Sequence, residues 1–441
     1  MKSIDQIAEE LAGYDPNSLR ADKVNAFLKE LVSPVLDTET VNLLDGLNRV
    51  LGEDIISPIS VPPHDNSAMD GFAFRGDQLD DSHSLQLRVI GTALAGKAWQ
   101  GTVRHGECLK IMTGAIMPEG LDTVVPQEMV TLNAEKTHIT IAPKVLQQGD
   151  NRRKTGEDLQ QGSPALLKGA HLTPAALGLI ASLGLPTVRV YRKIRVAYFS
   201  TGDEILSLGD TPREGAVFDS NRYTVFGLLT RMGCEVIDLG VVRDEPTVLE
   251  AAFVKAAAVA DAIITSGGVS VGEADYTRAM MKKLGAESGG VAFWRIAMRP
   301  GRPMAVGRIS SSLRKYYSNS YENNSAILFG LPGNPVAVMV TFLAFVRPAL
   351  LRMMGSNATT PPLLKARSTE VIRKKPGRTE YQRGTVSLAL DGTLLVKTTG
   401  NQGSGVLSSM VQANGLIVLH HDQSSVAIGD EIDVMMFDGV I

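Results

Sequence analysis

Four short apolar runs alternate with helical segments in the middle of the chain, and this alternation restricts the fold more than any other feature. The runs lie at residues 194–200, 235–240, 261–266 and 326–330. Helices are expected to begin at Asp219-Ser220, Pro246 and Pro335, because Asp and Ser accept hydrogen bonds from free helix amides and proline suits a first helical turn. Strands that alternate with helices predict a parallel sheet covered on both faces. We therefore expect a doubly wound α/β domain over residues 185–355.

The segments on either side of this domain are rich in β-prone runs. Before it, runs such as 108–112 and 123–126 are separated by Gly, Pro and Asn turns, which predicts a small β module over residues 56–143. Beyond Pro361-Pro362, a hairpin with Asp391-Gly392 at its turn predicts a C-terminal β-barrel domain over residues 356–441. The fold class is therefore α/β plus all-β modules.

The remaining residues, 1–55 and 144–184, are assigned to an elongated N-terminal and linker domain. Amphipathic spacing predicts helices at 24–36 and 39–51, and Thr173-Pro174 predicts the start of a third helix that ends at Gly184. The two early helices are candidates for struts between domains or subunits.

Composition excludes several classes of partner. Lys plus Arg number 44 and Asp plus Glu 47, so the net charge is 44 − 47 = −3, which gives no general attraction to nucleic acid or anionic membranes. Cys108 and Cys234 lie far apart, which suits a reducing compartment without structural zinc or disulfides. The first residues are acidic where an export signal would be basic, and the apolar stretch 336–346 is about half the roughly 20 residues of a membrane span. We expect a cytoplasmic protein that binds neither nucleic acid nor membrane.

In open α/β sheets, ligands bind at the carboxyl ends of the strands, so the loops that follow each apolar run are the first candidates for a site. Each of the four loops contributes permissive backbone, hydroxyl or carboxylate side chains, or both. They are Ser200–Glu204, Arg243–Glu245, Ser266–Asp275 and Gly330–Pro335.

The loop from Ser266 to Asp275 predicts a phosphate site. Gly267, Gly268 and Gly272 allow backbone N–H groups to face a ligand, and a helix that starts near Asp275 would direct its positive end to the same place. One helix terminus contributes only about 0.3–1 kcal/mol, so a polyanion also needs side-chain cations. An ordinary glycine turn is the alternative interpretation.

Three arginines within eight residues, Arg295, Arg299 and Arg302, are candidates for those cations, because guanidinium groups bind oxyanions in bidentate fashion. A solvated basic edge is the alternative. Asp203, Glu204, Asp244 and Asp275 follow strands of the same sheet. Carboxylates beside phosphate require a bridging divalent cation, which predicts Mg²⁺. Each acid taken singly is better explained as a helix cap or a surface acid, and it is their recurrence at strand ends that favours a site.

Polar motifs outside the sheet are weaker candidates. The segment 62–71 contains Asp65, Thr113 follows the run 108–112, and Asp158 closes a dense polar stretch. Arg378 and Ser404 belong to the C-terminal segment. A capped loop explains each of them equally well. No Walker loop, no GxGxxG after a strand and no GxSxG elbow with a supporting His is present, which argues against NTPase, hydride-transfer and serine-hydrolase chemistry.

Taken together, these motifs resemble the molybdopterin molybdenumtransferase family, MoeA, which is also seen as the gephyrin E domain. The resemblance rests on Asp65–Gly71, Met112–Gly114, Arg153–Asp158, Ser200–Glu204, Ser266–Tyr276 and Leu331–Pro335 in the order of the family. It implies a homodimer of four-domain subunits, with each active site between the α/β domain of one subunit and the Asp65 module of the other. The implied reaction inserts molybdenum from molybdate into adenylylated molybdopterin, with Mg²⁺-dependent release of AMP.

The resemblance also implies functional positions. These are Asp65, Thr113, Asp158, Glu204, Asp244, Asp275, Pro332, Pro335, Arg378 and Ser404. We assign Ser266, Gly267, Gly268, Ser270 and Gly272 to the pterin phosphate, and Arg295, Arg299 and Arg302 to oxyanion binding. Asp244 and Asp275 are expected to hold Mg²⁺ or the substrate. Asp65 and Glu204 are expected to orient the attacking oxygen.

Three positions depart from the family pattern. Arg295, Arg299 and Arg302 stand where Lys is expected, Phe72 stands where Tyr is common, and the loop at 310–325 is longer than expected. Two alternatives remain. One is a molybdopterin adenylyltransferase, whose glycine loop reads Gly-Gly-Thr-Gly rather than the Gly-Gly-Val-Ser present here; the other is a gephyrin-like scaffold. If the main interpretation holds, the adenylyltransferase is expected to be a transient partner, since it makes the substrate.

Overall fold

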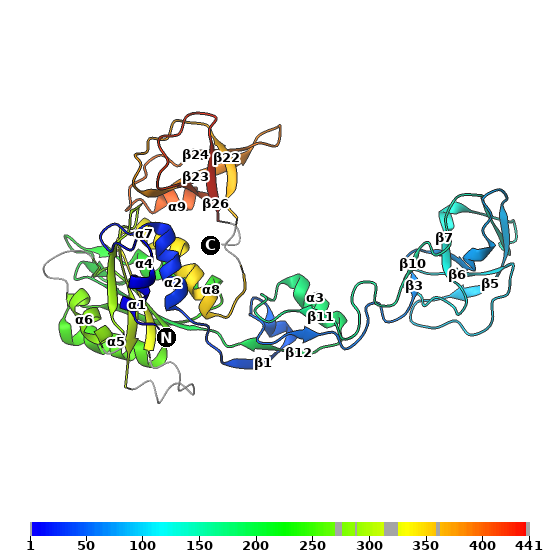
Figure 1. Cartoon of the computed structure of the whole chain (residues 1–441), viewed down its shortest axis with the longest axis horizontal. Helices are drawn as coiled ribbons and strands as arrows, with labels where there is room; N and C mark the ends of the chain where they lie inside the picture. Colours follow the sequence, from blue (N-terminus) through cyan, green and yellow to red (C-terminus); the bar gives the residue numbers. More distant parts are fainter. Residues whose placement is uncertain (1, 270–275, 287–288, 313–324, 359–361, 438–441) are drawn as a thin grey trace.

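The structure is a computed structural model that describes residues 2–269, 276–286, 289–312, 325–358 and 362–437. Its shape is elongated. An α/β domain and a C-terminal barrel lie together at one end, and a narrow linker connects them to a small β lobe at the other end (Figure 1). The chain passes along the linker twice, outward from the N-terminal helices and back to the α/β domain (Figure 1).

A six-stranded sheet forms the centre of the α/β domain. The strand order is β16 (Glu235–Val242), β13 (Arg195–Thr201), β17 (Ala262–Ser266), β21 (Ser325–Leu331), β20 (Pro303–Ser310) and β18 (Val291–Arg295). The first four strands are parallel, and β20 is antiparallel to both of its neighbours. The predicted parallel sheet is therefore confirmed. Because β20 is antiparallel to both β18 and β21, β18 runs in the same direction as the parallel strands and ends at the same edge.

Helices cover both faces of this sheet, as predicted. They are α4 (Ser220–Arg231), α5 (Pro246–Val259), α6 (Tyr276–Gly285), α7 (Pro335–Thr341), a π-helical turn (Phe342–Val346) and α8 (Arg347–Met353). On one face Phe253 of α5 packs edge-on against Phe199, with ring centroids 5.0 Å apart. On the other face α4, α7 and α8 share a core with β13, β17 and β21.

The first two helices also pack on the α/β domain. Helices α1 (Ile4–Glu10) and α2 (Ala21–Leu31) contribute to the core that contains α7 and α8, and Phe27 lies edge-on to Trp294 at 4.9 Å. Helix α2 ends earlier than the predicted residue 36, since Pro34 disfavours helical backbone at the residue before it. Residues 1–55 were expected to form part of the linker domain, but these two helices pack against the α/β domain instead. The division into domains stays a proposal.

The predicted helix at 39–51 is wrong. Residues Thr38–Asn42 form strand β1, which pairs antiparallel with β12 (Thr187–Tyr191), and a short 3-10 turn at Leu43–Gly46 follows. The β-branched residues Thr38, Thr40 and Val41 favour a strand, and pairing with β12 satisfies their backbone. The rest of the linker consists of β2 (Ile55–Ile56) paired with β11 (Pro164–Leu166), and of α3 (Pro174–Ser182).

The distal lobe is an all-β module, as the fold class predicts, whereas its bounds at 56–143 stay a prediction. Its sheet has the order β7 (Thr123–Pro126), β4 (Gly71–Phe74), β6 (Glu107–Ile111), β5 (Leu85–Ala93), β9 (His138–Ile141) and β8 (Val130–Leu132). A separate two-stranded ribbon pairs β3 (Asn66–Ser67) with β10 (Arg152–Arg153). This ribbon lies where the lobe meets the linker (Figure 1).

The C-terminal domain is a closed five-stranded barrel, as predicted. Its strands are β22 (Leu364–Ser368), β23 (Thr379–Leu388), β24 (Leu394–Thr398), β25 (Gly415–Leu419) and β26 (Glu431–Met436), with helix α9 (Ser408–Gln412) between β24 and β25. Pairing of β23 with both β24 and β25 closes the barrel. Strand β19 (Met298–Arg299) of the preceding domain pairs with the start of β23 and so attaches the barrel to the α/β domain.

The helical segment Pro335–Met353 is, by length and composition, apolar enough to cross a membrane. It lies inside the protein, however, with 78% of its most apolar window buried. Because Phe342, Phe345 and Val346 are completely buried in the core beside the sheet, the segment is a core helix.

Candidate active site

Three hydroxyl groups meet where β13 and β17 end. The Tyr198 hydroxyl lies 2.8 Å from Ser200 Oγ and 2.7 Å from Ser266 Oγ, and the two serine oxygens are 3.1 Å apart. All three side chains are buried, and burial raises the pKa of Tyr198. This cluster fixes Ser266, the first residue of the predicted phosphate loop, at the carboxyl edge of the sheet.

Positive φ angles and close contacts require glycine at both positions that follow Ser266. Gly267 has φ +89°, its N–H donates to the Leu331 carbonyl at 3.1 Å, and a Cβ there would lie 2.5 Å from the Thr201 carbonyl oxygen. At Gly268, with φ +63°, a Cβ would lie 2.4 Å from Thr277 Cβ. Only glycine lets the loop approach its neighbours this closely. The other predicted loop residues, Ser270, Gly272 and Asp275, lie outside the described residues.

Asp244 is held beside the same loop. It follows β16, is half-buried, and its Oδ1 accepts a hydrogen bond from Thr277 Oγ1 at 3.1 Å. Thr277 lies in the first turn of α6 and packs on Gly268, so the structure brings Asp244 and Gly268 to one place.

The described residues contain no group of three His, Cys, Asp or Glu side chains arranged to hold a metal. Mg²⁺ does not need three protein ligands, since it is commonly held by one or two carboxylates together with substrate phosphates. Asp244 fits that limited role chemically. The second predicted metal ligand, Asp275, is not among the described residues, so the structure does not test the pair.

Glu204 follows β13 at the same edge. Its backbone carbonyl accepts a hydrogen bond from Val217 N at 2.9 Å, and its exposed carboxylate folds over Gly202, where a Cβ would lie 2.5 Å from Glu204 Oε2. Glu204 is therefore located at the strand ends with its acidic group in solvent.

The Pro332–Pro335 loop joins this edge to the C-terminal barrel. Asn221 Nδ2 of α4 donates to the Gly333 carbonyl at 2.7 Å. Val336 N, at the start of α7, donates to the Ser404 carbonyl at 3.1 Å. Ser404 is far from Pro332 and Pro335 in sequence, but the structure places it beside the loop that contains them.

The predicted arginines lie at the same end of the sheet. Arg295 ends β18 opposite Pro303, the first residue of β20, and Arg295, Arg299 and Arg302 are all exposed. Arg299 and Arg378 line one cavity of about 720 Å³ between β19 and the barrel. The same cavity is lined by three basic residues that the sequence analysis missed: Arg373, Lys374 and Lys375.

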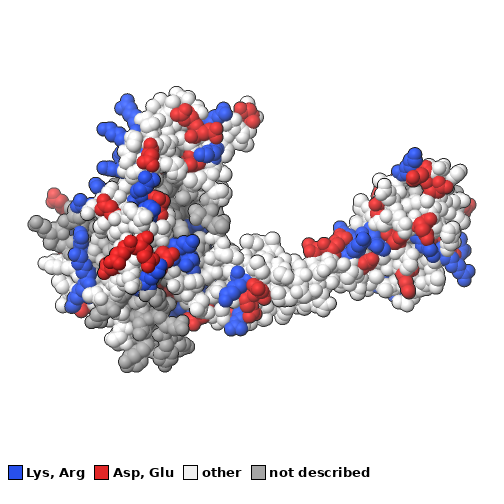
Figure 2. Space-filling view, viewed as in Figure 1, with Lys and Arg blue, Asp and Glu red and all other residues white. Residues whose placement is uncertain are grey.

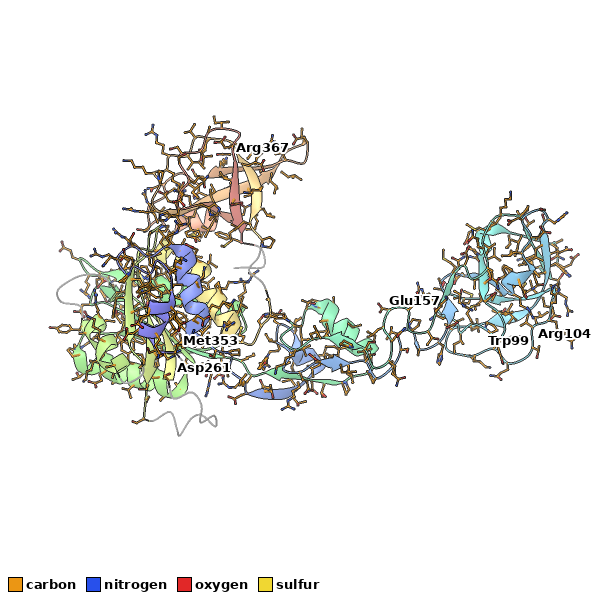
Figure 3. The ribbon with its side chains drawn as sticks, in the orientation of Figure 1. Trp99, Arg104, Glu157, Asp261, Met353 and Arg367 are labelled. Atoms are coloured by element: carbon orange, nitrogen blue, oxygen red, sulfur yellow. The ribbon has the colours of Figure 1, made fainter. Side chains whose placement is uncertain are left out.

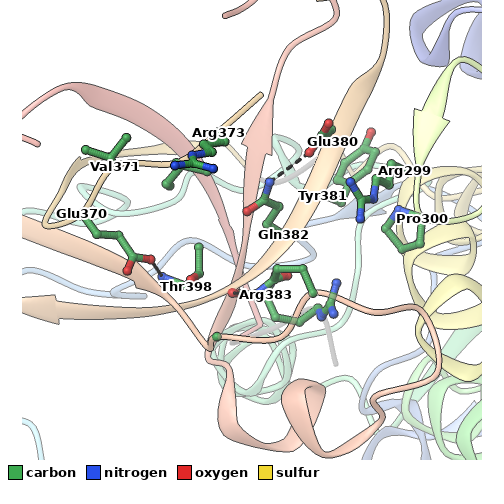
Figure 4. A pocket seen from close by; sticks show the side chains of 13 residues that line it. Arg299, Pro300, Glu370, Val371, Arg373, Glu380, Tyr381, Gln382, Arg383 and Thr398 are labelled. Atoms are coloured by element: carbon green, nitrogen blue, oxygen red, sulfur yellow. Dashed lines mark hydrogen bonds between the residues drawn. The ribbon is translucent and has the colours of Figure 1, made fainter. Parts of the chain in front are cut away.

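The missed residues carried a sequence signal, a run of three consecutive cations. Lys374 is buried, its Nζ donates to the carbonyl of Gln423 at 2.8 Å, and burial lowers its pKa. A second cavity of about 290 Å³ borders the first through Arg299 and also contains Arg383 (Figure 4). Among the residues that line this second cavity, Gln382 Nε2 donates to Glu380 Oε2 at 2.9 Å (Figure 4).

Asp65 lies in the distal lobe, beside the ribbon of β3 and β10. Its Oδ1 accepts hydrogen bonds from Thr155 N and Thr155 Oγ1, both at 2.8 Å, and its Oδ2 lies 3.6 Å from Arg152 Nε. The bond from the Thr155 amide is the main reason why the pKa of Asp65 lies below its usual value. Asp65 is therefore an oriented carboxylate that remains ionised.

Thr113 lies in the same lobe, whereas Asp158 lies at the lobe end of the linker, next to the bridge between Val61 and Leu159. Thr113 donates through both its amide and its hydroxyl to Asp70 Oδ1, each at 2.7 Å, and these bonds lower the pKa of Asp70. Asp158 is exposed, and its amide donates to the Val61 carbonyl at 3.1 Å. Within one chain this lobe is far from the α/β domain (Figure 1). The predicted residues therefore form two groups, one at the strand ends of the α/β domain and one at the distal lobe, and the linker separates them.

Charges of both signs are mixed on the visible face. Lys and Arg gather with acids where the distal lobe meets the linker and again on the part of the linker next to the α/β domain, whereas the middle of the linker shows little charge (Figure 2). Several large apolar side chains of the linker are exposed, including Leu36 at 66%, Leu44 at 87% and Ile56 at 50%.

Three family models match the chain. They are the MoeA N-terminal region (domain I and II) at residues 19–184, a probable molybdopterin binding domain at 197–352, and the MoeA C-terminal region (domain IV) at 365–437. Together they extend over most of the chain. The adenylyltransferase alternative was expected to share only the α/β domain, so it is not favoured.

Relatives of known name match over nearly the whole length. A molybdopterin molybdenumtransferase of Haemophilus influenzae is 40% identical over 424 residues, covering 96% of this chain and 100% of that protein. One from Nostoc sp. is 35% identical over 404 residues, covering 90% and 88%. The crystal structure of a molybdopterin biosynthesis moeA protein from Pyrococcus horikoshii OT3 superposes with a TM-score of 0.77 at 26% identity, covering 95% of this chain and 100% of that one. The chain therefore belongs to the molybdopterin molybdenumtransferase, or MoeA, family.

Proposed function

We propose that this protein inserts molybdenum from molybdate into adenylylated molybdopterin and releases AMP. The observation that carries the proposal is the convergence of Ser266, Gly267, Asp244 and Ser404 at one edge of the α/β sheet in a chain of this family. A phosphate needs backbone amides that face it, and the positive φ angles of Gly267 and Gly268 turn the loop for that purpose. The Gly267 amide already donates to the Leu331 carbonyl, so the Gly268 amide is the proposed donor among the described residues. We assign this loop, including Ser270 and Gly272, to the pterin phosphate.

Oxyanion binding is assigned to the cations beside the loop. Arg295, Arg299 and Arg302 are exposed at the carboxyl edge, and Arg378 shares a cavity with Arg299. A planar guanidinium presents two parallel donors to an oxyanion, which a lysine ammonium cannot do. Molybdate, as substrate, would therefore meet a different donor geometry here than at a site built from lysines.

Mg²⁺ is the cation proposed for the acidic side of the site. Asp244 would hold it, with Asp275 as the expected second ligand, and the ion would neutralise charge on the substrate phosphates. Gly267 and Gly268 give the phosphate loop its shape, and Glu204 lies near this loop with its carboxylate exposed to solvent.

We also propose a homodimer in which the distal lobe of one subunit completes the site of the other. The lobe that carries Asp65 and Thr113 lies at the far end of the linker from the α/β domain (Figure 1), so we expect these residues to serve the α/β site of a second subunit. The exposed apolar residues of the linker, such as Leu36 and Leu44, supply surface that a second subunit would bury. In this arrangement Asp65 would orient the attacking oxygen together with Glu204.

A cytoplasmic location and transient contact with the adenylyltransferase that supplies the substrate complete the proposal. The reducing cytoplasm suits the two buried free thiols, Cys108 and Cys234. Direct contact would shorten the path of a labile adenylylated intermediate between the two enzymes.

The test is an assay of the purified protein with adenylylated molybdopterin, in which molybdate and Mg²⁺ are varied separately. We expect AMP release to increase with molybdate and to stop when Mg²⁺ is chelated. AMP release that is independent of molybdate, or synthesis of the adenylylated compound from ATP, would contradict the proposal.

A further inference from the structure

Arg383 is a buried guanidinium that the sequence analysis did not single out. It lies in β23 with 1% of its surface exposed. Its Nε donates to Ser409 Oγ at 2.9 Å, and its Nη2 donates to the carbonyls of Gly403 at 2.9 Å and Asn401 at 3.3 Å. These partners are neutral. Burial, and secondly the charge of Arg299, lower the pKa of Arg383 to about 10, so that burying this charge is costly but leaves it protonated at neutral pH.

The backbone of the same residue holds the same loop. Arg383 N donates to Gln402 Oε1 at 2.8 Å, and Gln402 Nε2 donates back to the Arg383 carbonyl at 3.1 Å. The Thr399 amide donates to that carbonyl at 3.0 Å. Residues 399–403 are therefore attached to one residue by both its side chain and its backbone.

Ser404, the next residue along the chain, connects this loop to the candidate active site. Ser404 accepts a hydrogen bond through its carbonyl from Val336 N at 3.1 Å. Val336 follows the Pro332–Pro335 loop in the first turn of α7. Figure 4 shows the Arg383 side chain beside Arg299 and Pro300, where the barrel meets the α/β domain.

The barrel does not need this charge to close. Strand β23 is paired over residues 384–388 with β24 and over residues 380–384 with β25, so its backbone is already held on both sides. A buried charge with neutral partners stabilises a fold poorly compared with an apolar side chain of similar size. The contacts instead determine the position of one loop.

We propose that Arg383 is a positioning residue that holds residues 399–404 against the start of α7 and thereby keeps Ser404 at the substrate site. The inference rests on the proposed function and goes beyond it, because it assigns a positioning task to a residue that the sequence analysis did not include among the site residues. Lysine cannot replace Arg383, since one ammonium cannot reach the three acceptors that the guanidinium fork contacts.

The test compares Arg383→Lys with the wild-type protein in the molybdate-dependent AMP assay. We expect KM for molybdate to rise about tenfold or more, the effect of losing one charge-assisted hydrogen bond, while kcat at saturating molybdate falls less than about threefold. Hydrogen exchange of the Val336 amide and of amides 399–404 should become faster in the same variant.

Two further variants make the test decisive. Gln402→Ala removes the loop's attachment to the Arg383 backbone, leaves the guanidinium in place, and should change KM in the same direction, so it replaces Arg383→Lys if that variant does not fold. Arg367→Lys is the matched control, since Arg367 is an exposed arginine on the far part of the same barrel (Figure 3).

Unchanged exchange at Val336, or faster exchange with unchanged KM, would overturn the proposal. The proposal would also be overturned if the activity of Arg383→Lys fell only in proportion to the fraction of protein that is folded. The exchange measurement is independent of the assay. If the wild-type protein shows no molybdate-dependent AMP release, the proposed function fails, whereas faster exchange at Val336 in Arg383→Lys still supports the loop attachment.

Discussion

Arg192 binds Asp261 with two parallel hydrogen bonds, Nη1 to Oδ2 at 2.7 Å and Nη2 to Oδ1 at 2.9 Å. Arg192 directly follows the linker strand β12, and Asp261 directly precedes β17 at the amino end of the α/β sheet. Asp261 is 4% exposed and also accepts a hydrogen bond from the Arg195 amide at 2.8 Å (Figure 3). This pair therefore joins the linker to the edge of the sheet opposite the candidate active site.

We expect Asp261→Asn to destabilise the α/β domain. Removing one partner of a buried ion pair costs about 3–5 kcal/mol. Arg192 keeps a second acidic partner, since its Nε lies 3.1 Å from Asp37 Oδ2. We therefore expect the lower end, about 3 kcal/mol, which corresponds to a fall of roughly 6–12 °C in the thermal midpoint. Asp81→Asn, at an exposed position in the distal lobe, is the control and should leave the midpoint unchanged. Equal midpoints for both variants would show that the pair contributes little.

The same pair predicts a dependence of stability on pH. Burial alone would raise the pKa of Asp261, but the hydrogen bonds and charge of Arg192 and the Arg195 amide outweigh it, so the pKa lies below its usual value. A lowered folded-state pKa means that the contribution is complete above the unfolded pKa of 3.8 and is lost as pH falls through the folded one. The difference in midpoint between the wild-type protein and Asp261→Asn should be constant from about pH 7 to 5 and narrow below about pH 4. A difference that persists unchanged at about pH 3 would contradict this origin.

Gly267→Ala should remove activity and reduce stability. The new Cβ would lie 2.5 Å from the Thr201 carbonyl oxygen at a residue with φ +89°, so the loop must shift. We expect a loss of about 1–3 kcal/mol in unfolding free energy, and a loss of AMP release larger than this destabilisation explains. Gly333→Ala is the matched control on the neighbouring loop, because the nearest atom to its Cβ, Gly267 Cα, is 4.0 Å away. Comparable activity losses in the two variants would indicate that strain at Gly267 is unimportant.

Much of the α/β domain could be predicted because its signals are local. Asp219 caps α4 by accepting a hydrogen bond from Arg222 N at 3.0 Å, and Pro246 and Pro335 open α5 and α7 as predicted. Strand-end loops converge in any parallel sheet, so Ser266 and Asp244 were placed at one edge before their contacts were known.

Features that depend on contacts between distant segments could not be predicted in this way. Residues 39–51 have helical spacing, yet Thr38–Asn42 pairs with a strand about 150 residues later, and that pairing decides the structure. The role of Arg383 is invisible in sequence because its partners, Gly403 on the loop after β24 and Ser409 in α9, come beside β23 only in the folded barrel. The cavity shared by Arg299 and Arg378 likewise exists only because β19 pairs with β23.

Thr155→Val should impair the ionised state of Asp65. The substitution removes the hydroxyl that donates to Asp65 Oδ1 at 2.8 Å and leaves the amide bond at the same distance. The pKa of Asp65 should then rise toward its usual value, since hydrogen bonds to the carboxylate are what lower it. If AMP release requires ionised Asp65, its acid limb should move to higher pH, and this is measured as a pH–rate profile. Thr131→Val, at an exposed threonine of β8, is the control, and an identical profile for both variants would exclude this role of Thr155.

Two inactive variants should restore activity to each other if the site is shared between subunits. Asp65→Asn inactivates the distal lobe, and Asp244→Asn inactivates the α/β site, and the linker keeps these two positions apart within one chain (Figure 1). When the variants are unfolded together, mixed in equal amounts and refolded, half of the dimers are mixed, and one of the two sites in each mixed dimer contains only native residues. About a quarter of the wild-type AMP release should therefore return. A mixture of Asp244→Asn with Glu204→Gln, both in the α/β domain, is the control and should remain inactive. No recovery in the first mixture, with mixed dimers verified by mass spectrometry, would mean that each site is formed within a single chain.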